Sequence, residues 1–294
     1  MKKRIKFLVG VLVMGAIASC SSKDDSPSGG GSGQTQTIEV LEKEVEKLYL
    51  REGNAKSDES IEDYNKQTSY TYDEKGLMIG GRSLIIMRGE ENQDINFKVE
   101  YDVKNRFTRM TSKDKYGLSA EVDSKFTYDD KGRLLNKTTV TDPQEQMTFF
   151  YNNKDQVIKI ERLNERGNLR IYEGYQYNSK GLLSGMLDDV YAVEGYEYDD
   201  KPTPYVGMPF PFSFPLDAIS PYVGEIEWTY KASNNLVKLS RFSSDGSVRE
   251  IVEIKYEYDK VTGKPLKSVM TLDLGTNSRR IEKEFVYKTI TIKK

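Results

Sequence analysis

The chain is very poor in the residues on which many catalytic and metal sites depend. Its 294 residues include no histidine and a single cysteine. The lack of histidine excludes Ser-His-Asp and Cys-His catalysis, imidazole metal ligands and a histidine pH switch. One cysteine allows neither an internal disulfide nor a thiolate zinc site.

The chain also lacks a strong excess of either charge. It has 44 basic and 46 acidic side chains, a net charge of −2. A nucleic-acid-binding protein needs a basic surface to neutralise phosphates, so we expect no nucleic-acid partner. The phosphate-binding glycine motifs, the GxSxG motif and the twelve-residue EF-hand loop are missing too. We therefore expect no cofactor, no metal site and no catalytic residue.

The first nineteen residues have the pattern of a secretory signal peptide. Basic residues (Lys2, Lys3, Arg4 and Lys6) precede an apolar run that ends at Ala18. The run is roughly 12 residues long, whereas a spanning helix needs about 20. A basic segment, a short apolar segment and small residues before a cleavage site are typical of such a peptide.

The end of this segment, Ile17-Ala18-Ser19-Cys20, resembles the bacterial lipobox. The resemblance implies that cleavage follows Ser19 and that Cys20 becomes a lipidated N-terminus. Acyl chains on Cys20 would then hold the protein to a membrane. The alternative is that Cys20 is a free buried cysteine.

Residues 20–37 are predicted to form a flexible tether. They contain no large apolar side chain and are rich in glycine and serine, which is typical of a flexible coil. The Lys23-Asp24-Asp25 group resembles the short acidic export signal of Bacteroidota-type surface lipoproteins. This implies an outer-membrane anchor with surface exposure, and periplasmic residence is the alternative.

Residues 38–294 are predicted to form a single β-repeat domain. Nine segments place an aromatic or apolar residue two positions before a tyrosine, with a mean spacing of about 27 residues. Residues i and i+2 share one face of a strand, so each segment indicates a strand with an aromatic face. The nine tyrosines are Tyr72, Tyr101, Tyr128, Tyr151, Tyr177, Tyr198, Tyr230, Tyr258 and Tyr287.

The residues after each tyrosine predict a tight turn. Asp or Asn follows the tyrosine in seven of the nine segments, where a turn needs a short hydrogen-bond acceptor. Four residues after the tyrosine come types that tolerate a left-handed backbone, as a hairpin with a G1 bulge requires. These are Gly76, Asn105, Gly132, Asp155 and Gly181, with Asn235 and Gly263 at an offset of five.

Two strands per repeat predict an all-β antiparallel meander of about 16–18 strands. One face of the sheet is polar and the other carries tyrosines and aliphatic residues, so the sheet should curl or close into a barrel. Weaker turns at the opposite end are expected at Arg88-Gly89, Asp142-Pro143, Arg166-Gly167, Asp245-Gly246 and Gly275-Thr276. A helix is predicted only over residues 38–49, with a strand over residues 48–51 as the alternative.

The Y-x-Y-D-x-x-G-x-L unit resembles the YD repeats of RHS-type secreted proteins. Tyr198-Asp199-Asp200-Lys201 and the stretch from Ser233 to Lys238 are similar to a family of uncharacterised Bacteroidota-type envelope lipoproteins. The resemblance implies an all-β repeat domain on the cell envelope with no established activity. The irregular spacing and short length argue against a toxin-enclosing shell, although an RHS-like secreted-protein fragment is an alternative.

One irregular segment, residues 201–224, is the candidate functional region. It holds six of the nine prolines together with many apolar side chains, and proline keeps its central part out of a strand ladder. The segment could fold over an open end of the sheet as a plug, or expose a surface for a glycan or an envelope protein; the two can coexist. The candidate surface comprises Tyr205, Phe210, Phe212, Phe214, Tyr222 and Trp228.

The sequence therefore favours a non-catalytic binding or structural module outside the cytoplasm. The rival from another class is a carboxylate-based glycan hydrolase that uses an acidic pair. Adjacent residues in a strand point to opposite faces, so such a pair does not form a catalytic dyad. The pairs are Asp129-Asp130, Asp188-Asp189 and Asp199-Asp200.

Overall fold

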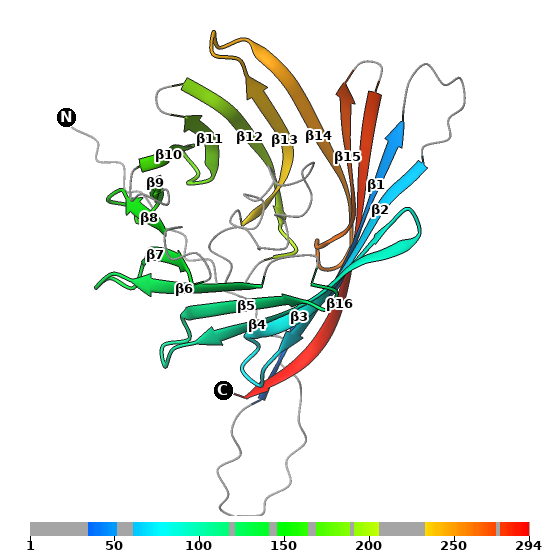
Figure 1. Cartoon of the computed structure of the whole chain (residues 1–294), viewed down its shortest axis with the longest axis vertical. Coiled ribbons are helices and arrows are strands. Elements are labelled where there is room, and N and C mark those ends of the chain that lie inside the picture. Colours follow the sequence, from blue (N-terminus) through cyan, green and yellow to red (C-terminus); the bar gives the residue numbers. More distant parts are fainter. Residues whose placement is uncertain are drawn as a thin grey trace, which may run out of the picture. The chain divides into compact units, whose positions relative to one another are not determined.

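The computed structural model is a closed barrel of sixteen antiparallel strands (Figure 1). It describes residues 35–51, 61–117, 121–140, 146–163, 169–188, 191–205, 233–274 and 277–293. Each strand pairs with its neighbours in sequence, and the first strand pairs with the last. The predicted all-β meander and its strand number are confirmed, and the sheet closes.

The strands follow one another in chain order around the barrel. They are β1 (Thr35–Arg51), β2 (Ile61–Tyr72), β3 (Met78–Met87), β4 (Glu90–Tyr101), β5 (Phe107–Asp114), β6 (Val122–Tyr128), β7 (Leu134–Thr139), β8 (Gln146–Tyr151), β9 (Val157–Leu163), β10 (Leu169–Tyr177), β11 (Leu183–Asp188), β12 (Tyr191–Pro202), β13 (Asn234–Phe242), β14 (Val248–Tyr258), β15 (Pro265–Leu274) and β16 (Asn277–Lys293). All sixteen belong to one compact unit. The predicted signal peptide and Cys20 lie outside the described residues.

The predicted repeat turn is present and joins β2 to β3, β4 to β5, β6 to β7, β8 to β9 and β10 to β11. In its first copy the Gly76 N–H donates to the Asp73 carbonyl oxygen at 3.1 Å, and Gly76 has φ +81°. Asn105, Gly132, Asp155 and Gly181 are left-handed as well, with φ between 58° and 82°. The strand register shifts at the tyrosine before each of these turns, as a G1 bulge requires.

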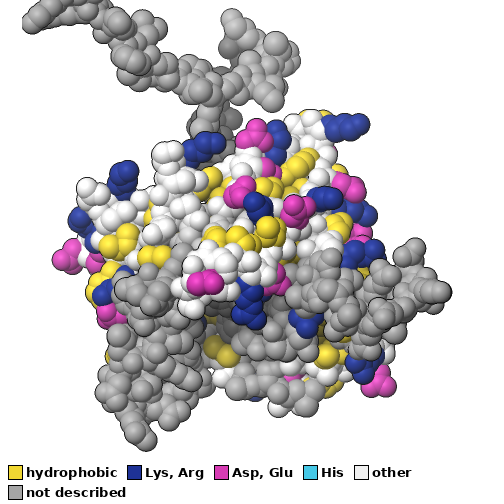
Figure 2. Space-filling view, turned by 90° about the horizontal axis from the view of Figure 1, so that it is seen from above, with side chains coloured by type: hydrophobic (Ala, Val, Ile, Leu, Met, Phe, Trp, Pro, Cys, Tyr) yellow, Lys and Arg dark blue, Asp and Glu magenta, His cyan; other side chains and the backbone are white. Residues whose placement is uncertain are grey.

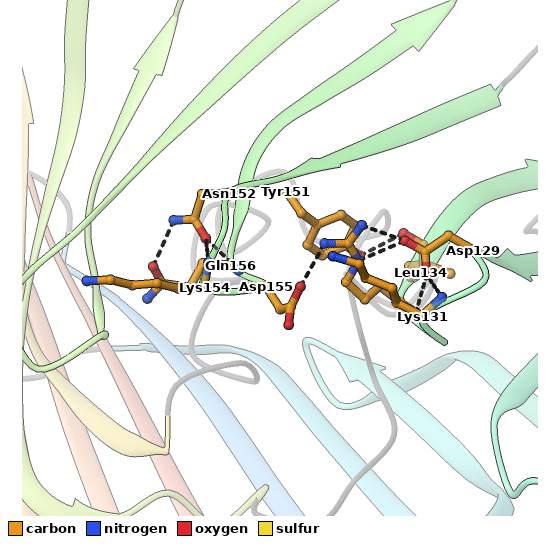
Figure 3. Close-up of polar contacts among 9 residues, drawn as sticks. Asp129, Lys131, Leu134, Tyr151, Asn152, Lys154, Asp155 and Gln156 are labelled. Atoms are coloured by element: carbon orange, nitrogen blue, oxygen red, sulfur yellow. Dashed lines mark hydrogen bonds and ion pairs between the residues drawn. The ribbon is translucent and has the colours of Figure 1, made fainter.

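The turn aspartate holds its own loop together. Asp129 Oδ1 accepts hydrogen bonds from the backbone N–H groups of Lys131 and Arg133 at 3.0 and 2.9 Å (Figure 3). The backbone N–H of Arg133, followed by its guanidinium, lowers the pKa of Asp129. Arg133 Nη1 also donates to Asp155 Oδ1 of the next turn at 2.7 Å. Neighbouring repeats are thus linked at the turns as well as along the strands.

The predicted helix over residues 38–49 is wrong, because this segment belongs to β1. Leu41 and Leu48 are both 2% exposed although they are seven positions apart, an odd spacing that would put them on opposite faces of a regular strand. A bulge between Leu41 and Lys43 restores their common orientation. The strand begins at Thr35, so the last residues of the predicted tether are paired with β16.

Asn235 is also not a left-handed turn residue. It is absent from the residues with positive φ in the described chain, and it lies in β13, which pairs directly with β12. Tyr230 and most of the 201–224 segment lie outside the described residues, between these two strands. Gly263 has φ +70° in the longer turn between β14 and β15, as predicted.

At the other end of the barrel, two of the expected turns are described. Arg88 and Gly89 have φ of 51° and 86° and join β3 to β4 as a two-residue turn. Gly246, with φ +81°, closes the turn between β13 and β14, as expected for Asp245-Gly246. Asp142-Pro143, Arg166-Gly167 and Gly275-Thr276 include residues outside the described ranges.

Along much of the barrel wall, apolar side chains face inward and polar side chains face outward. Along β4, Ile95, Phe97 and Val99 are buried, whereas the alternating side chains of Lys98 and Glu100 are exposed. A large cluster of buried aliphatic and aromatic residues fills the interior. Figure 2 shows basic and acidic side chains interspersed over the described surface of one face.

Candidate functional site

The repeated tyrosines are structural and line the interior near the repeat turns. Six of the repeat tyrosines, and also Tyr256, donate the hydroxyl hydrogen to a carbonyl oxygen on the preceding strand, as in Tyr101 to Met78 at 2.6 Å. Figure 3 shows the same contact from Tyr151 to Leu134, at 2.7 Å. Seven tyrosines make this bond: Tyr72, Tyr101, Tyr128, Tyr151, Tyr177, Tyr256 and Tyr287. Burial raises their pKa values, to about 12 for Tyr128, Tyr151 and Tyr177.

Two described repeat tyrosines depart from this pattern: Tyr258 donates to the Asp199 carboxylate, and Tyr198 makes no such bond. Its hydroxyl is buried without a hydrogen-bond partner. Pairing between β11 and β12 begins only at Gly185 and Gly195, so the strands do not pair beside Tyr198. Tyr198 is the last repeat tyrosine before the proline-rich segment, and the irregularity there extends into the barrel wall.

The start of the proline-rich segment lies inside the barrel. The Thr203 N–H donates to the Ser233 carbonyl oxygen at 3.1 Å, which brings the start of this segment (the insertion between β12 and β13) beside the residue that precedes β13. Tyr205 is 5% exposed, and its ring packs edge-on against Phe285 with centroids 6.2 Å apart. Tyr205 is therefore not part of an exposed surface. Its burial is what a plug would produce. Phe210, Phe212, Phe214, Tyr222 and Trp228 lie outside the described residues.

Tyr205 is bound to a buried carboxylate on β1. Its hydroxyl donates to Glu44 Oε2 at 2.6 Å, and Tyr70 donates to Glu44 Oε1 at 3.0 Å. Glu44 is 5% exposed. Two hydroxyl donors on one buried carboxylate hold the segment against the wall, because charge-assisted hydrogen bonds are stronger than neutral ones.

A second buried carboxylate, Glu46, is paired with a cation. Lys283 Nζ lies 2.7 Å from Glu46 Oε2, and Lys66 is also near. Burial by itself raises the pKa of Glu46, but the charges of Lys283 and Lys66 outweigh it and lower that pKa. Glu44, Glu46, Lys66 and Lys283 together carry no net formal charge.

An inner cavity lies between residues 203–205 and the inner face of β13–β16. Its volume is about 40 Å³, so it can hold only a molecule of a few non-hydrogen atoms. Its walls are mainly apolar, with Asn235, Ser268 and Lys283 as the main polar additions from the strands. The apolar lining comprises Leu236, Ile254, Tyr256, Met270, Ile281 and Phe285.

A mouth cavity of about 220 Å³ lies at the repeat-turn end of the barrel. It is lined by the start of β1, by Tyr72 and Tyr287, and by the Glu39–Lys264 ion pair, whose charged atoms are 2.7 Å apart. Thr203 and Pro204 border both cavities. The first residues of the insertion thus separate the mouth cavity from the inner cavity.

Asn235 connects the inner cavity to the base of the insertion. Its side-chain Nδ2 donates to the carbonyl oxygens of Pro202 and Lys201 at 3.2 and 3.3 Å and to the carboxylate of Asp199 at 3.3 Å. Its Oδ1 atom is buried and has no hydrogen-bond partner. Asn235 is 2% exposed and lines the inner cavity.

Of the acidic pairs considered for catalysis, the described residues Asp129, Asp130, Asp199 and Asp200 do not line either cavity. Asp129 is engaged in its turn, and Asp199 accepts hydrogen bonds from the Lys201 N–H and the Tyr258 hydroxyl. Asp188 ends β11, and Asp189 lies outside the described residues. Within the described ranges, no cluster of three or more acidic or cysteine residues could hold a metal ion. Those ranges also contain no helix long and apolar enough to cross a membrane.

No protein-family model matches the chain, and no curated protein matches it. Among solved structures, a porin-like protein from Bacteroides uniformis is similar, with a TM-score of 0.52, 16% identity, and 84% of this chain and 98% of that chain covered. This likeness shows a shared barrel fold. A β-barrel-like protein from Brucella abortus has a TM-score of 0.31, 12% identity and coverages of 85% and 98%. A LolA superfamily protein from Nitrosomonas europaea has a TM-score of 0.30, 10% identity and coverages of 85% and 86%.

Sequence reasoning missed the buried polar residues of the site. Glu44, Glu46 and Lys283 lie in strands where charged side chains alternate with apolar ones. In sequence these residues resemble the solvent-exposed face of a strand. Their inward orientation depends on the closure of the barrel. The sequence predicts a turn at Asn235, whereas the structure places it in β13. The sequence signal for its role is its position shortly after the proline-rich segment.

Proposed function

We propose that this protein is a lipid-anchored, non-catalytic binding module of the bacterial cell envelope, attached through acyl chains on Cys20. The observation that carries the proposal is the position of residues 202–205, which enter the barrel and separate the mouth cavity from the inner cavity. An irregular segment held on a rigid scaffold is a common way to build a binding site. The likeness of the repeats to YD units and to envelope lipoproteins supports the same location.

The polarity of the barrel wall supports a lipid anchor as the means of membrane attachment. Membrane-spanning barrels carry an outward apolar band and a polar interior. Here the outward positions of β4 include Lys98 and Glu100, and the inward positions from Ile95 to Val99 are apolar. A barrel with this pattern is suited to water on its outside, with a separate element for attachment.

The anchor is tested by labelling cells with an alkyne fatty acid. We expect the wild-type chain to be labelled and to fractionate with the outer membrane, and the Cys20→Ala chain to lose both properties. Protease treatment of intact cells then separates surface exposure from periplasmic residence. Equal labelling of the two chains would contradict the lipid anchor.

The binding role is tested with a glycan and envelope-protein screen on the full chain. Glu39→Gln alters the mouth cavity, and Glu42→Gln is its matched control, because Glu42 also lies on β1 and pairs with Lys288 but does not line the cavity. We expect Glu39→Gln to weaken binding at least about threefold and Glu42→Gln to leave it unchanged. A second variant, with Phe210, Phe212 and Phe214 changed to Ser, tests the rest of the insertion.

A purely structural envelope component is the second candidate, favoured by the tyrosine row and linked turns. It predicts that the screen yields no ligand.

A carboxylate-based hydrolase is the third candidate function, and it predicts glycan turnover that depends on an acidic pair.

A further inference from the structure

We propose that the inner cavity is a binding site for a compact, neutral, mainly apolar molecule that carries one hydroxyl or N–H donor, which bonds to Asn235 Oδ1. The inference rests on the proposed binding role and specifies the ligand class for a site distinct from the mouth cavity. Three observations support it: the shape of the cavity, its charge balance, and one unpartnered buried acceptor.

The cavity walls favour an apolar ligand. Leu236, Ile281 and Phe285 are each at most 6% exposed, and Ile254 and Met270 complete the surface formed by β13–β16. A cavity lined in this way excludes strongly hydrated molecules, because their polar groups would lose water without replacement. The ligand must therefore be mainly hydrocarbon.

The charged residue of the cavity, Lys283, does not require an ionic ligand as a counterion. Lys283 is the charged group in the lining, and it already lies 2.7 Å from Glu46. A carboxylate or phosphate on the ligand would have to compete with this buried pair. A neutral ligand leaves the pair intact.

The orientation of the Asn235 amide is set by its surroundings. Its Nδ2 atom faces the Asp199 carboxylate and the carbonyl oxygens of Lys201 and Pro202, all of which only accept hydrogen bonds. Rotating the amide by 180° would place Oδ1 against these oxygens. Oδ1 must therefore stay on the other side, as an acceptor with no donor.

A buried acceptor without a donor is rare in folded proteins and calls for an explanation. A ligand that brings one donor would satisfy Asn235 Oδ1 at no further cost in protein desolvation. A site of this kind discriminates strongly against an analogue without the donor, because the acceptor then stays unpaired. The cavity should therefore distinguish two molecules of the same shape by a single hydroxyl.

The test uses ethanol and acetonitrile, which are both small enough for a cavity of about 40 Å³ and similar in size but differ in the donor. The purified full chain is labelled with 13C at the methionine methyl groups, and the two compounds are titrated by NMR. Met270 lines the cavity, whereas Met110 and Met147 are buried elsewhere in the barrel. We expect ethanol to shift the Met270 resonance, to leave Met110 and Met147 unchanged, and to bind at least about tenfold more tightly than acetonitrile.

Ile254→Phe fills the cavity and should abolish the Met270 shift. Ile251→Phe is the matched control on the same strand, because Ile251 is 49% exposed and faces outward. If Ile254→Phe fails to fold, the comparison of the two compounds on the wild-type chain still decides the question. No Met270 shift with ethanol, or equal affinity for ethanol and acetonitrile, would overturn the inference.

Failure of this experiment is distinct from failure of the proposed function. Acylation of Cys20 and the effect of Glu39→Gln at the mouth cavity are measured separately. Loss of the cavity site with both of those results intact would leave an envelope binding module that uses only its mouth.

Discussion

Tyr128 on β6 donates its hydroxyl hydrogen to the carbonyl oxygen of Phe107 on β5, 2.5 Å away. The same bond recurs at six further tyrosines around the barrel and is missing at Tyr198, whose hydroxyl is buried without a partner. Comparing Tyr128 with Tyr198 therefore measures how much one such hydrogen bond contributes to the stability of the barrel.

Removing the hydroxyl should have opposite effects at these two positions. Tyr128→Phe leaves a carbonyl oxygen without its donor, so we expect it to lower the free energy of unfolding by about 1 kcal/mol. Tyr198→Phe removes an unpaired polar group and should be neutral or stabilising. Denaturant unfolding of both variants measures the difference, and equal losses would show that the hydrogen bond is not the cause.

The repeat turn should be sensitive to a side chain at its left-handed position. Gly132 has φ +81°, and Gly132→Ala is expected to cost about 1–2 kcal/mol. Asn105 occupies the same position with φ +58°, so Asn105→Gly should stay within about 0.5 kcal/mol of the wild type. Thermal unfolding of the two variants provides the measurement. An unaffected Gly132→Ala chain would argue against a strained backbone in this turn.

The buried ion pair should be far more important than an exposed one. Glu46→Gln removes a buried carboxylate from half-buried Lys283 and buried Lys66, and we expect a loss of about 3–5 kcal/mol. Glu284→Gln breaks an exposed pair with Lys267, 3.0 Å apart, and should cost about 0–1 kcal/mol. Comparable losses in urea unfolding would be inconsistent with the buried position of Glu46.

Removing Tyr205 should reveal how firmly the insertion is held. Tyr205→Phe keeps the packing on Phe285 but removes one of two donors to buried Glu44, so we expect a cost of about 1–3 kcal/mol. Tyr116→Phe is the control, because Tyr116 donates to Glu91 at the same distance of 2.6 Å in an exposed position; its cost should be below about 0.5 kcal/mol. Limited proteolysis should detect release of the insertion in Tyr205→Phe alone.

Stability should decline only in acid. The pKa of Glu46 is lowered by Lys283 and Lys66 against the effect of burial, and hydrogen bonds from Arg82 lower that of Asp94. A carboxylate with a lowered folded pKa contributes stability above its unfolded pKa, here 4.5 and 3.8, and this is lost as pH falls through the folded value. With no histidine in the chain, the free energy of unfolding should be nearly constant from about pH 6 to pH 8. A decline centred near pH 6 would refute this account.

Most of the local structure could be predicted because it depends on neighbouring residues. The alternating aromatics, the turn aspartates and the left-handed positions such as Gly76 act within a few residues. The error in β1 arose from the bulge after Leu41, which gives Leu41 and Leu48 a helix-like spacing in a strand. The buried carboxylate of Glu44 depends on Tyr205, 161 positions away. No local pattern records such a contact.

Closure of the barrel has a consequence for biosynthesis. Thr35 on β1 pairs with Lys293 on β16. The strand that leaves the ribosome first therefore cannot complete its pairing until the last strand has been synthesised. Pairings at such sequence distances form slowly, since the intervening chain must be ordered first. Until then β1 has an open edge, and its lysines and glutamates would deter pairing with the strands of other nascent chains.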